Sequence, residues 1–121
     1  MGVEDELGAL RAAFPGCSII AFADLEARIV LVSSSASTAR RDTLDGMCSS
    51  AVAMFAAAER AGEHAADTVL RSQNGSLEVA LRDPVRRDDA LCAICAPETD
   101  LDGYLLRARA VLDALAQEGG V

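Results

Sequence analysis

The sequence predicts a single domain of the α+β class, with helices on both faces of an antiparallel sheet. Helical and β-rich segments follow the order helix, strand, strand, helix, strand, strand, strand, helix. Hairpin connections between successive strands imply antiparallel pairing. The strands near residues 17–23 and 90–96 are apolar on both faces. A three-layer sandwich is the most economical way to bury them.

Length and charge exclude several function classes. A chain of 121 residues supports one core, so residues 1–121 are expected to form one domain. Acidic residues outnumber basic ones by 19 to 11, and a net charge of −8 argues against nucleic-acid binding. No apolar run approaches the roughly 18 residues of a membrane span. The acidic start lacks the features of a secretory signal, so we expect a cytoplasmic protein with reduced cysteines.

The first third of the chain predicts a helix and a hairpin. Residues 3–14 form an amphipathic helix that Pro15-Gly16 ends. Residues 17–23 and 28–33 are β-rich runs joined by a short turn, which predicts two paired strands. The apolar stripe of the helix has spacings of 4, 3 and 4, at Val3, Leu7, Leu10 and Phe14.

A second hairpin is expected over residues 66–82, because Asn74-Gly75 is the preferred pair for a two-residue type I′ turn. With that turn, the numbers of paired residues sum to 149. This register gives the hairpin one wet, charged face and one packed face. The expected pairs are Arg71 with Glu78 and Asp67 with Arg82 on the wet face, and Thr68 with Leu81 and Leu70 with Val79 on the other.

The chain ends in a buried strand and a long helix. Residues 88–96 are expected to form a strand covered on both faces, and residues 98–118 the helix. Glu98 and Asp100 charge the start of that helix, and Thr99 is a candidate cap. The expected buried stripe is Leu101, Leu105, Ala108, Leu112 and Leu115, flanked by Tyr104 and Val111.

The middle helix departs from the usual amphipathic pattern. Asp42 or Thr43 is expected to cap it, and it runs to about Ala61, with Gly62 as its stop. Its inner face is predicted from Leu44, Cys48, Ala51, Phe55 and Ala58, yet residues 51–58 carry no polar side chain at all. Either this is an alanine-rich helix favoured by propensity, or its outer face is a second contact surface. The outer residues are Val52, Ala53, Met54, Ala56 and Ala57.

With these features the chain resembles the Roadblock / dynein-light-chain domain family. The resemblance rests on the helix ending Phe14-Pro15-Gly16, the hairpin from Cys17 to Ser33, the small-residue helix from Leu44 to Ala61, the Asn74-Gly75 hairpin, and the segment from Ala90 to Pro97 with the helix after it. It implies a profilin-like five-stranded antiparallel sheet, with one helix on one face and two on the other. The first hairpin turn, Asp24 to Ala27, lacks the glycine often seen there.

The resemblance also implies function. Family members form homodimers or heterodimers through the third strand and the central helix. Bacterial members often partner small Ras-like GTPases as activators, other regulators or scaffolds. Carried over to this chain, the strand is Asp67 to Ser72. The expected interface comprises Met47, Val52, Ala53, Met54 and Ala57 on the helix and Asp67, Thr68, Val69, Leu70 and Arg71 on the strand.

Residues suited to catalysis or metal binding do not form a recognisable site. Cys92 and Cys95 have C-x-x-C spacing, but they fall in an apolar strand and point to opposite faces, which favours core packing over redox chemistry or zinc binding. His64 lies near a helix end with no nucleophile placed beside it. The segment from Ser33 to Thr38 lacks the glycine and lysine of a phosphate-binding loop.

We therefore expect a non-enzymatic, dimeric signalling adaptor that pairs with itself or a paralogue and binds a small GTPase. The expected chemistry needs no catalytic residue, metal ion or cofactor. The alternative is a small-ligand sensor with an apolar profilin-like pocket. The basic pairs Arg40-Arg41 and Arg86-Arg87 are solvated charges or partner contacts.

Overall fold

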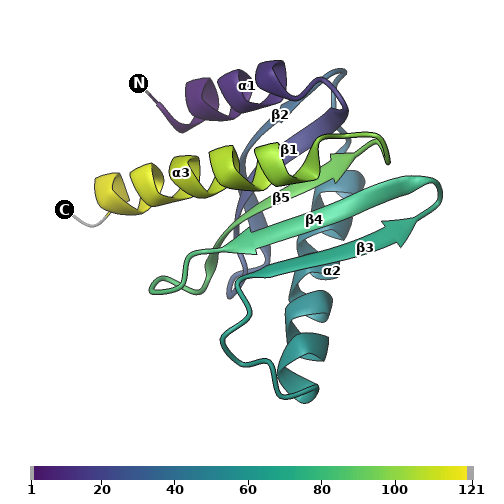
Figure 1. Ribbon diagram of the computed structural model, residues 1–121. Coiled ribbons are helices and arrows are strands. Elements are labelled where there is room, and N and C mark those ends of the chain that lie inside the picture. The colour runs from purple at the N-terminus through teal and green to yellow at the C-terminus, as the bar shows by residue number, and fades with distance from the viewer. Residues whose placement is uncertain (1, 120–121) are drawn as a thin grey trace.

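The computed structural model describes residues 2–119, and it confirms the predicted order of elements (Figure 1). The five strands form one antiparallel sheet in the order β2-β1-β5-β4-β3. This order makes β5 central and leaves β2 and β3 at the two edges. The elements are α1 (Val3–Ala13), β1 (Cys17–Asp24), β2 (Ile29–Ser35), α2 (Arg41–Arg60), β3 (Thr68–Gln73), β4 (Ser76–Arg82), β5 (Asp89–Cys95) and α3 (Leu101–Gly119).

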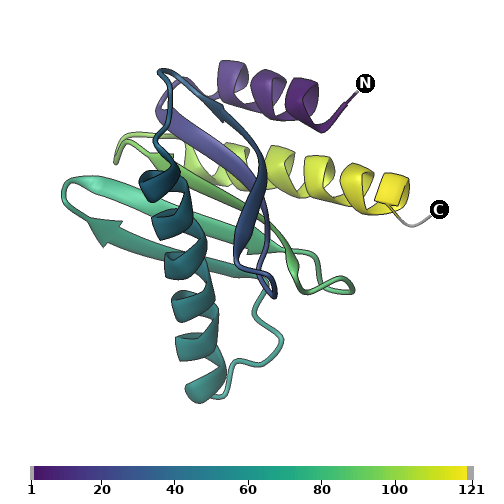
Figure 2. The same cartoon turned by 180° about the vertical axis from the view of Figure 1, so that it is seen from behind.

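The helices form two unequal layers on the sheet, as expected from the family resemblance. Helices α1 and α3 lie side by side on one face, whereas α2 covers the other face alone (Figures 1 and 2). Both views show the last turns of α2 extending beyond the strands. The two layers therefore leave different amounts of the sheet covered.

The core between the sheet and the α1/α3 layer is built from large side chains. Leu7 and Leu10 of α1 pack with Ile20, Leu81 and Leu91 of the sheet. From α3, the predicted stripe supplies Ala108 and Leu112, with Leu101 and Leu105 partly buried. Tyr104 was expected on the flank of this stripe and instead lies in its centre, where it is 1% exposed and is the largest fully buried side chain.

The core under α2 is built mainly from small side chains. Cys48, Ala51 and Phe55 of the helix pack on Ala21, Ala23, Ala80, Ala90 and Cys92 of the sheet. Alanine side chains bring the helix close to the strands and bury little area per residue. The large exceptions are Leu25, Met47 and Phe55. Phe55 lies near the end of α2 that extends beyond the strands.

The predicted helix caps are wrong in two places. Helix α2 begins at Arg41 after Arg40, and no side chain caps it, so neither Asp42 nor Thr43 has that role. At α3, the carboxylate of Asp100 accepts a hydrogen bond from the backbone N–H of Gly103 at 3.2 Å. Thr99 Oγ1 is buried and has no hydrogen-bond partner within the described residues. Carboxylate and hydroxyl caps have similar preference, so sequence alone does not choose between neighbours.

Two tight turns use backbone conformations with positive φ. Asn74 and Gly75 have φ of 52° and 79°, as a type I′ turn requires. In the first hairpin, which lacks a glycine, Arg28 adopts φ of 59°. The Asp24 carboxylate supports that turn by accepting hydrogen bonds from the N–H groups of Glu26 and Ala27, each at 3.0 Å.

The predicted register of the second hairpin is confirmed at every pair from Thr68–Leu81 to Gln73–Ser76. Arg71 lies 3.0 Å from the Glu78 carboxylate, as expected. Asp67 and Arg82 do not form the expected ion pair, because Asp67 pairs with Arg109 of α3 at 3.1 Å. The charged face is also not wet throughout: Arg82 is buried beside α2.

Candidate interaction surface at the second helix and third strand

Strand β3 presents a free backbone edge. The N–H of Arg82 donates to the carbonyl of Asp67 at 2.8 Å, which makes residues 67 and 82 a hydrogen-bonded pair. Hydrogen-bonded and non-hydrogen-bonded pairs alternate along an antiparallel ladder. Residues 69, 71 and 73 therefore direct their backbone groups to β4. Thr68, Leu70 and Ser72 direct theirs outward, and no strand within residues 2–119 accepts them.

One flank of α2 faces this edge. Arg71 of β3 donates a hydrogen bond to the hydroxyl of Ser50 at 2.6 Å, and also contacts Gln73 and Glu78 at 2.8 and 3.0 Å. Beside these contacts a cleft of about 370 Å³ runs between the two elements. Gly46 and Ser50 line it on the helix side, and Asn74 and Glu78 on the hairpin side. The helix and the strand edge thus belong to one continuous surface.

The outer side of α2 carries a stripe of small side chains, here called the small-residue face. Its members recur at spacings of three and four residues, so they lie on one side of the helix. In the described part of the chain, no other element covers them. The small-residue face consists of Gly46, Ser49, Ala53 and Ala57, all of them exposed.

The expected helix residues divide into three groups. Ala53 and Ala57 lie on the small-residue face, and Met54 is half-buried beside it. Val52 lies on the flank away from β3, where it lines a cleft with Leu25. Met47, which the family resemblance placed in the interface, is 5% exposed and packs in the core under α2, so its side chain does not lie on the outer face. Flexible methionine side chains at the border of an apolar stripe fill gaps in the core.

The expected strand residues are distributed over both faces of the sheet. Val69 is half-buried against the α2 core, whereas Leu70 points to the opposite face and is 48% exposed. Asp67 and Thr68 are held by Arg109 of α3 at 3.1 and 3.2 Å. Arg71 is exposed and points toward α2. What these residues share is the backbone edge, not one side-chain face.

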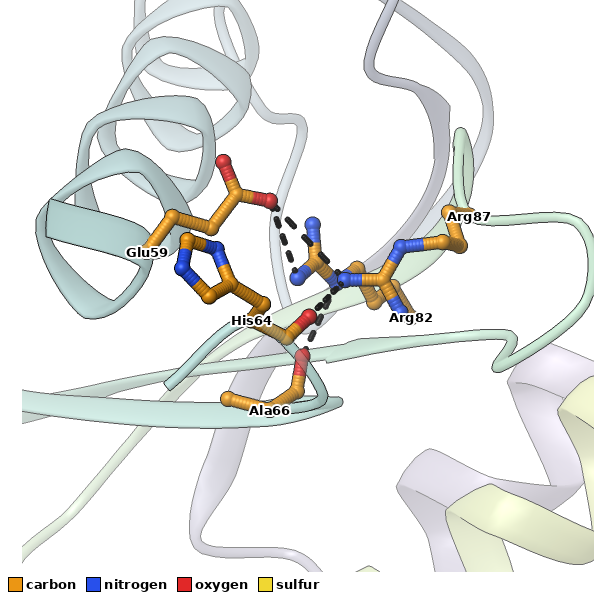
Figure 3. A network of polar contacts seen from close by, with 5 residues as sticks. All are labelled: Glu59, His64, Ala66, Arg82 and Arg87. Atoms are coloured by element: carbon orange, nitrogen blue, oxygen red, sulfur yellow. Dashed lines mark hydrogen bonds and ion pairs between the residues drawn. The ribbon is translucent and has the colours of Figure 1, made fainter. Parts of the chain in front are cut away.

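A buried arginine fixes the segment that joins α2 to β3, a feature missed in the sequence. Arg82 lies 4.2 Å above the ring of Phe55, and its side chain is 7% exposed. Its Nε donates to the carbonyl of Ala66 at 3.0 Å, and its terminal nitrogen lies 3.4 Å from the Glu59 carboxylate (Figure 3). Arg82 lies on the strand face that was predicted to be exposed to solvent, so its burial could not be recognised from the sequence.

A second arginine reaches the same connection from the loop after β4. Arg87 donates to the carbonyl of His64 at 2.6 Å and lies 3.8 Å from the Glu59 carboxylate (Figure 3). Glu59 of α2 therefore receives two guanidinium groups. The cluster of Glu59, Arg82 and Arg87 ties α2 to the connection before β3, so it sets the position of the two elements that form the candidate surface.

The cysteines of the C-x-x-C pair are packed in the two hydrophobic cores. Cys92 lies under α2, and Cys95 lies in the α1/α3 core, so the C-x-x-C pair points to opposite faces as expected. Burial raises the pKa of Cys92 to about 12, which keeps its thiol protonated. Among the residues described, no group of three or more His, Cys, Asp or Glu side chains is arranged to hold a metal ion. None of the described helices has the length and apolarity needed to cross a bilayer.

Comparison with known structures identifies the fold. A Roadblock/LC7 domain from Streptomyces avermitilis superposes with a TM-score of 0.81 at 11% identity, covering 98% of each chain. MglB from Myxococcus xanthus gives 0.77 at 13% identity, covering 98% of this chain and 94% of that one. The gliding protein MglB from Thermus thermophilus gives 0.72 at 17% identity, with 95% and 86% covered. No protein-family model and no curated protein sequence matches this chain.

The protein therefore has the Roadblock/LC7 fold, as its sequence features suggested. The agreement extends over nearly the whole chain, so no separate region of residues 2–119 needs another structural explanation. At identities of 11–17%, these likenesses describe the arrangement of the backbone. More specific statements depend on the surfaces of this chain itself.

Proposed function

We propose that this protein is a non-catalytic adaptor that pairs with a second copy of itself or with a paralogue and binds a small Ras-like GTPase in the cytoplasm. One observation carries the proposal: the free backbone edge of β3 lies beside the uncovered small-residue face of α2. An open strand edge is a template for pairing with another strand, and small side chains let a second helix approach closely.

The edge supplies backbone hydrogen bonds for association. Thr68, Leu70 and Ser72 present unpaired N–H and C=O groups, and a second β3 in antiparallel orientation satisfies them in pairs. A two-fold axis between the strands makes the contact self-complementary. The same axis places the two copies of α2 on one side of the joined sheet.

The small-residue face then permits close packing of the two helices. The distance between packed helices is about 8–10 Å and depends on the side chains at the contact. Ala53 and Ala57 are short enough for the lower part of that range, and Met54 beside them adapts its shape to a partner. The proposed interface comprises Ala53, Met54 and Ala57 of α2 with Asp67, Thr68, Val69, Leu70 and Arg71 around the strand edge.

The comparisons support association without identifying a partner. One similar structure is described as MglB with a tetrameric arrangement, with a TM-score of 0.73 at 18% identity. A tetrameric arrangement is thus described for a protein of this fold. The GTPase partner is proposed from the resemblance to bacterial Roadblock proteins, and whether binding activates the GTPase or recruits it is left to experiment.

A charge placed on the small-residue face tests the pairing. Ala53→Glu should convert a dimer into a monomer, because two buried carboxylates would face each other across the axis. Multi-angle light scattering at micromolar concentration measures the mass. Ala110→Glu, at an exposed position of α3, is the matched control and should leave a dimer. A monomeric wild-type protein, or two variants that behave alike, contradicts the proposed surface.

A direct titration tests the GTPase. The purified wild-type protein is mixed with a Ras-like GTPase from the same genome, loaded with GDP or a non-hydrolysable GTP analogue, and binding is followed by calorimetry. We expect binding that depends on the nucleotide, with a change in hydrolysis rate only if the protein is an activator. Absence of binding to every such GTPase in either nucleotide state contradicts the partner class and leaves the pairing test unaffected.

A further inference from the structure

Two cysteines far apart in the sequence meet at one end of the sheet. Cys17 is the first residue of β1, Cys95 is the last residue of β5, and they are direct partners in the antiparallel ladder. Their Sγ atoms are 2.8 Å apart. Both side chains belong to the core beneath α1 and α3, with exposed fractions of 0% and 1%. No local pattern associates Cys17 with Cys95, because 77 residues lie between them.

The backbone pairing of Cys17 and Cys95 is of the kind that accepts a cross-strand disulfide, and the register of β1 on β5 shifts between Cys17 and Ile19. The N–H of Ala96 donates to the carbonyl of Gly16 at 2.8 Å, so the neighbouring pair of Cys17 and Cys95 is a non-hydrogen-bonded pair. In such pairs the Cα atoms are typically about 4.5 Å apart and the side chains are close. Disulfides span Cα separations of about 4.4–6.8 Å. Because the two Sγ atoms are already 2.8 Å apart, a disulfide of about 2.0 Å requires only a small further approach of the sulfurs.

The two thiols are coupled through the hydrogen bond that they share. A hydrogen bond from the Cys95 thiol lowers the pKa of Cys17 from its ordinary value, even though burial acts in the other direction. The same hydrogen bond, followed by burial, raises the pKa of Cys95. A thiolate is the reactive form of cysteine. The residue before Cys17 also lines a cleft of about 420 Å³ between Phe14, Gly16 and Thr99, next to this end of the sheet.

We propose that Cys17 and Cys95 form a site of reversible oxidative modification, at which a peroxide converts the two thiols into a disulfide between β1 and β5. The Cys17 thiolate attacks one oxygen of hydrogen peroxide, the O–O bond breaks, and hydroxide leaves and is protonated to water. The Cys95 sulfur then attacks the resulting sulfenic acid: the S–S bond forms, the S–O bond breaks, and the hydroxyl leaves as water with the Cys95 proton. The sulfurs lose two electrons, which reduce the peroxide, and a dithiol reverses the reaction.

The other two cysteines provide an internal comparison. Cys48 and Cys92 lie in the core under α2, on the opposite side of the sheet. Burial raises the pKa of both, and the Cys48 thiol is directed at the carbonyl of Asp24 at 3.9 Å. Neither has a thiol partner of the kind that Cys17 and Cys95 give each other. They should keep their thiols under conditions that oxidise the first pair.

Oxidation of the folded protein tests this site. The native protein is treated with hydrogen peroxide, alkylated after denaturation, and mapped by peptide mass spectrometry. We expect a product about 2 Da lighter before alkylation, a Cys17–Cys95 cross-link in the peptide map, two alkylated thiols in place of four, and a return to four after dithiothreitol. The double variant Cys48→Ala/Cys92→Ala should still form the link, and Cys17→Ala should not.

The remaining outcomes contradict the proposal. They are four free thiols after treatment, a link that involves Cys48 or Cys92, or irreversible oxidation of single cysteines without a link. Urea unfolding gives a second readout that does not depend on any variant: the oxidised wild-type protein should unfold at higher urea than the reduced protein, because the link closes a long loop. The test depends neither on dimerisation nor on a GTPase, so its failure leaves the proposed function untouched.

Discussion

The two faces of the sheet are covered in different ways, and the difference explains which surface remains available. On one face, α1 and α3 lie side by side and enclose large side chains such as Tyr104, Leu81 and Leu112. On the other, α2 lies alone on alanines and cysteines. Two helices cover most of the first face, whereas one helix leaves its own flanks and the β3 edge uncovered (Figure 2).

The two layers are expected to contribute differently to the stability of the fold. The α1/α3 layer buries more apolar area per residue, so it should contribute more to the free energy of unfolding. The α2 layer relies on close approach, on Phe55, and on the polar cluster around Arg82. Its small outer side chains contribute little to the stability of the monomer and are the ones that the proposed association uses.

The largest loss of stability is expected in the α1/α3 core. Tyr104→Ala removes the largest fully buried side chain and its edge-on contact with Phe14, and should lower the free energy of unfolding by about 3–5 kcal/mol. The counterpart under α2, Cys92→Ala, removes one sulfur atom and should cost about 1 kcal/mol. Urea denaturation followed by circular dichroism measures both. Equal losses would mean that the two layers do not differ as described.

The next effect concerns the cluster that positions α2. Arg82→Ala removes a buried guanidinium from Phe55, Ala66 and Glu59, and should cost about 2–3 kcal/mol, since hydrogen bonds of charged groups are worth more than neutral ones. The Glu59 carboxylate is 44% exposed, which moderates the loss. Arg71→Ala is the control at an exposed pair and should cost under about 1 kcal/mol. If Arg82→Ala costs no more stability than Arg71→Ala, the cluster does not stabilise the position of α2.

The smallest effect is a pH dependence of the stability that arises at Asp89, the first residue of β5. Burial raises the pKa of Asp89, with added repulsion from the Asp24 carboxylate. The folded state therefore favours the protonated carboxyl. This stabilisation is complete below the ordinary carboxyl pKa and is lost as pH rises through the higher pKa of the folded state.

Asp89→Asn should therefore raise the thermal midpoint slightly at neutral pH, and the gain should shrink as the pH falls through that range. Differential scanning calorimetry from pH 3 to pH 7 measures the difference, with Asp113→Asn on the exposed side of α3 as the control. A gain that does not change with pH would show that the carboxyl proton is not its cause.

Local signals in the sequence predicted the fold well. The Asn74-Gly75 turn sets the whole register of β3 and β4, because a two-residue loop leaves one pairing. The continuous apolar run of β5 correctly indicated a central strand. The choice of cap at α3 was wrong, since Thr99 and Asp100 are both suitable residues and only tertiary packing decides between them.

Contacts between distant segments were harder to predict. The pairing of Arg82 with Glu59, and of Cys17 with Cys95, depends on how elements pack across the sheet, which no local pattern encodes. The helix wheel identified Ala53 and Ala57 as outer residues, but it left Met47 outside the core stripe. Long flexible side chains at the border of a stripe can turn either way.

The central claim is that the β3 edge pairs with a second copy, and a proline at that edge tests it most directly. Leu70→Pro removes an outward N–H and no ladder bond to β4. Ser33→Pro is the matched control on the β2 edge, where the bond from Ala36 N–H to the Ser18 carbonyl places Ser33 outward by the same alternation. Sedimentation equilibrium should give a dimer of twice 12.6 kDa for the wild type and Ser33→Pro, and a folded monomer for Leu70→Pro. A dimeric Leu70→Pro protein would contradict the account.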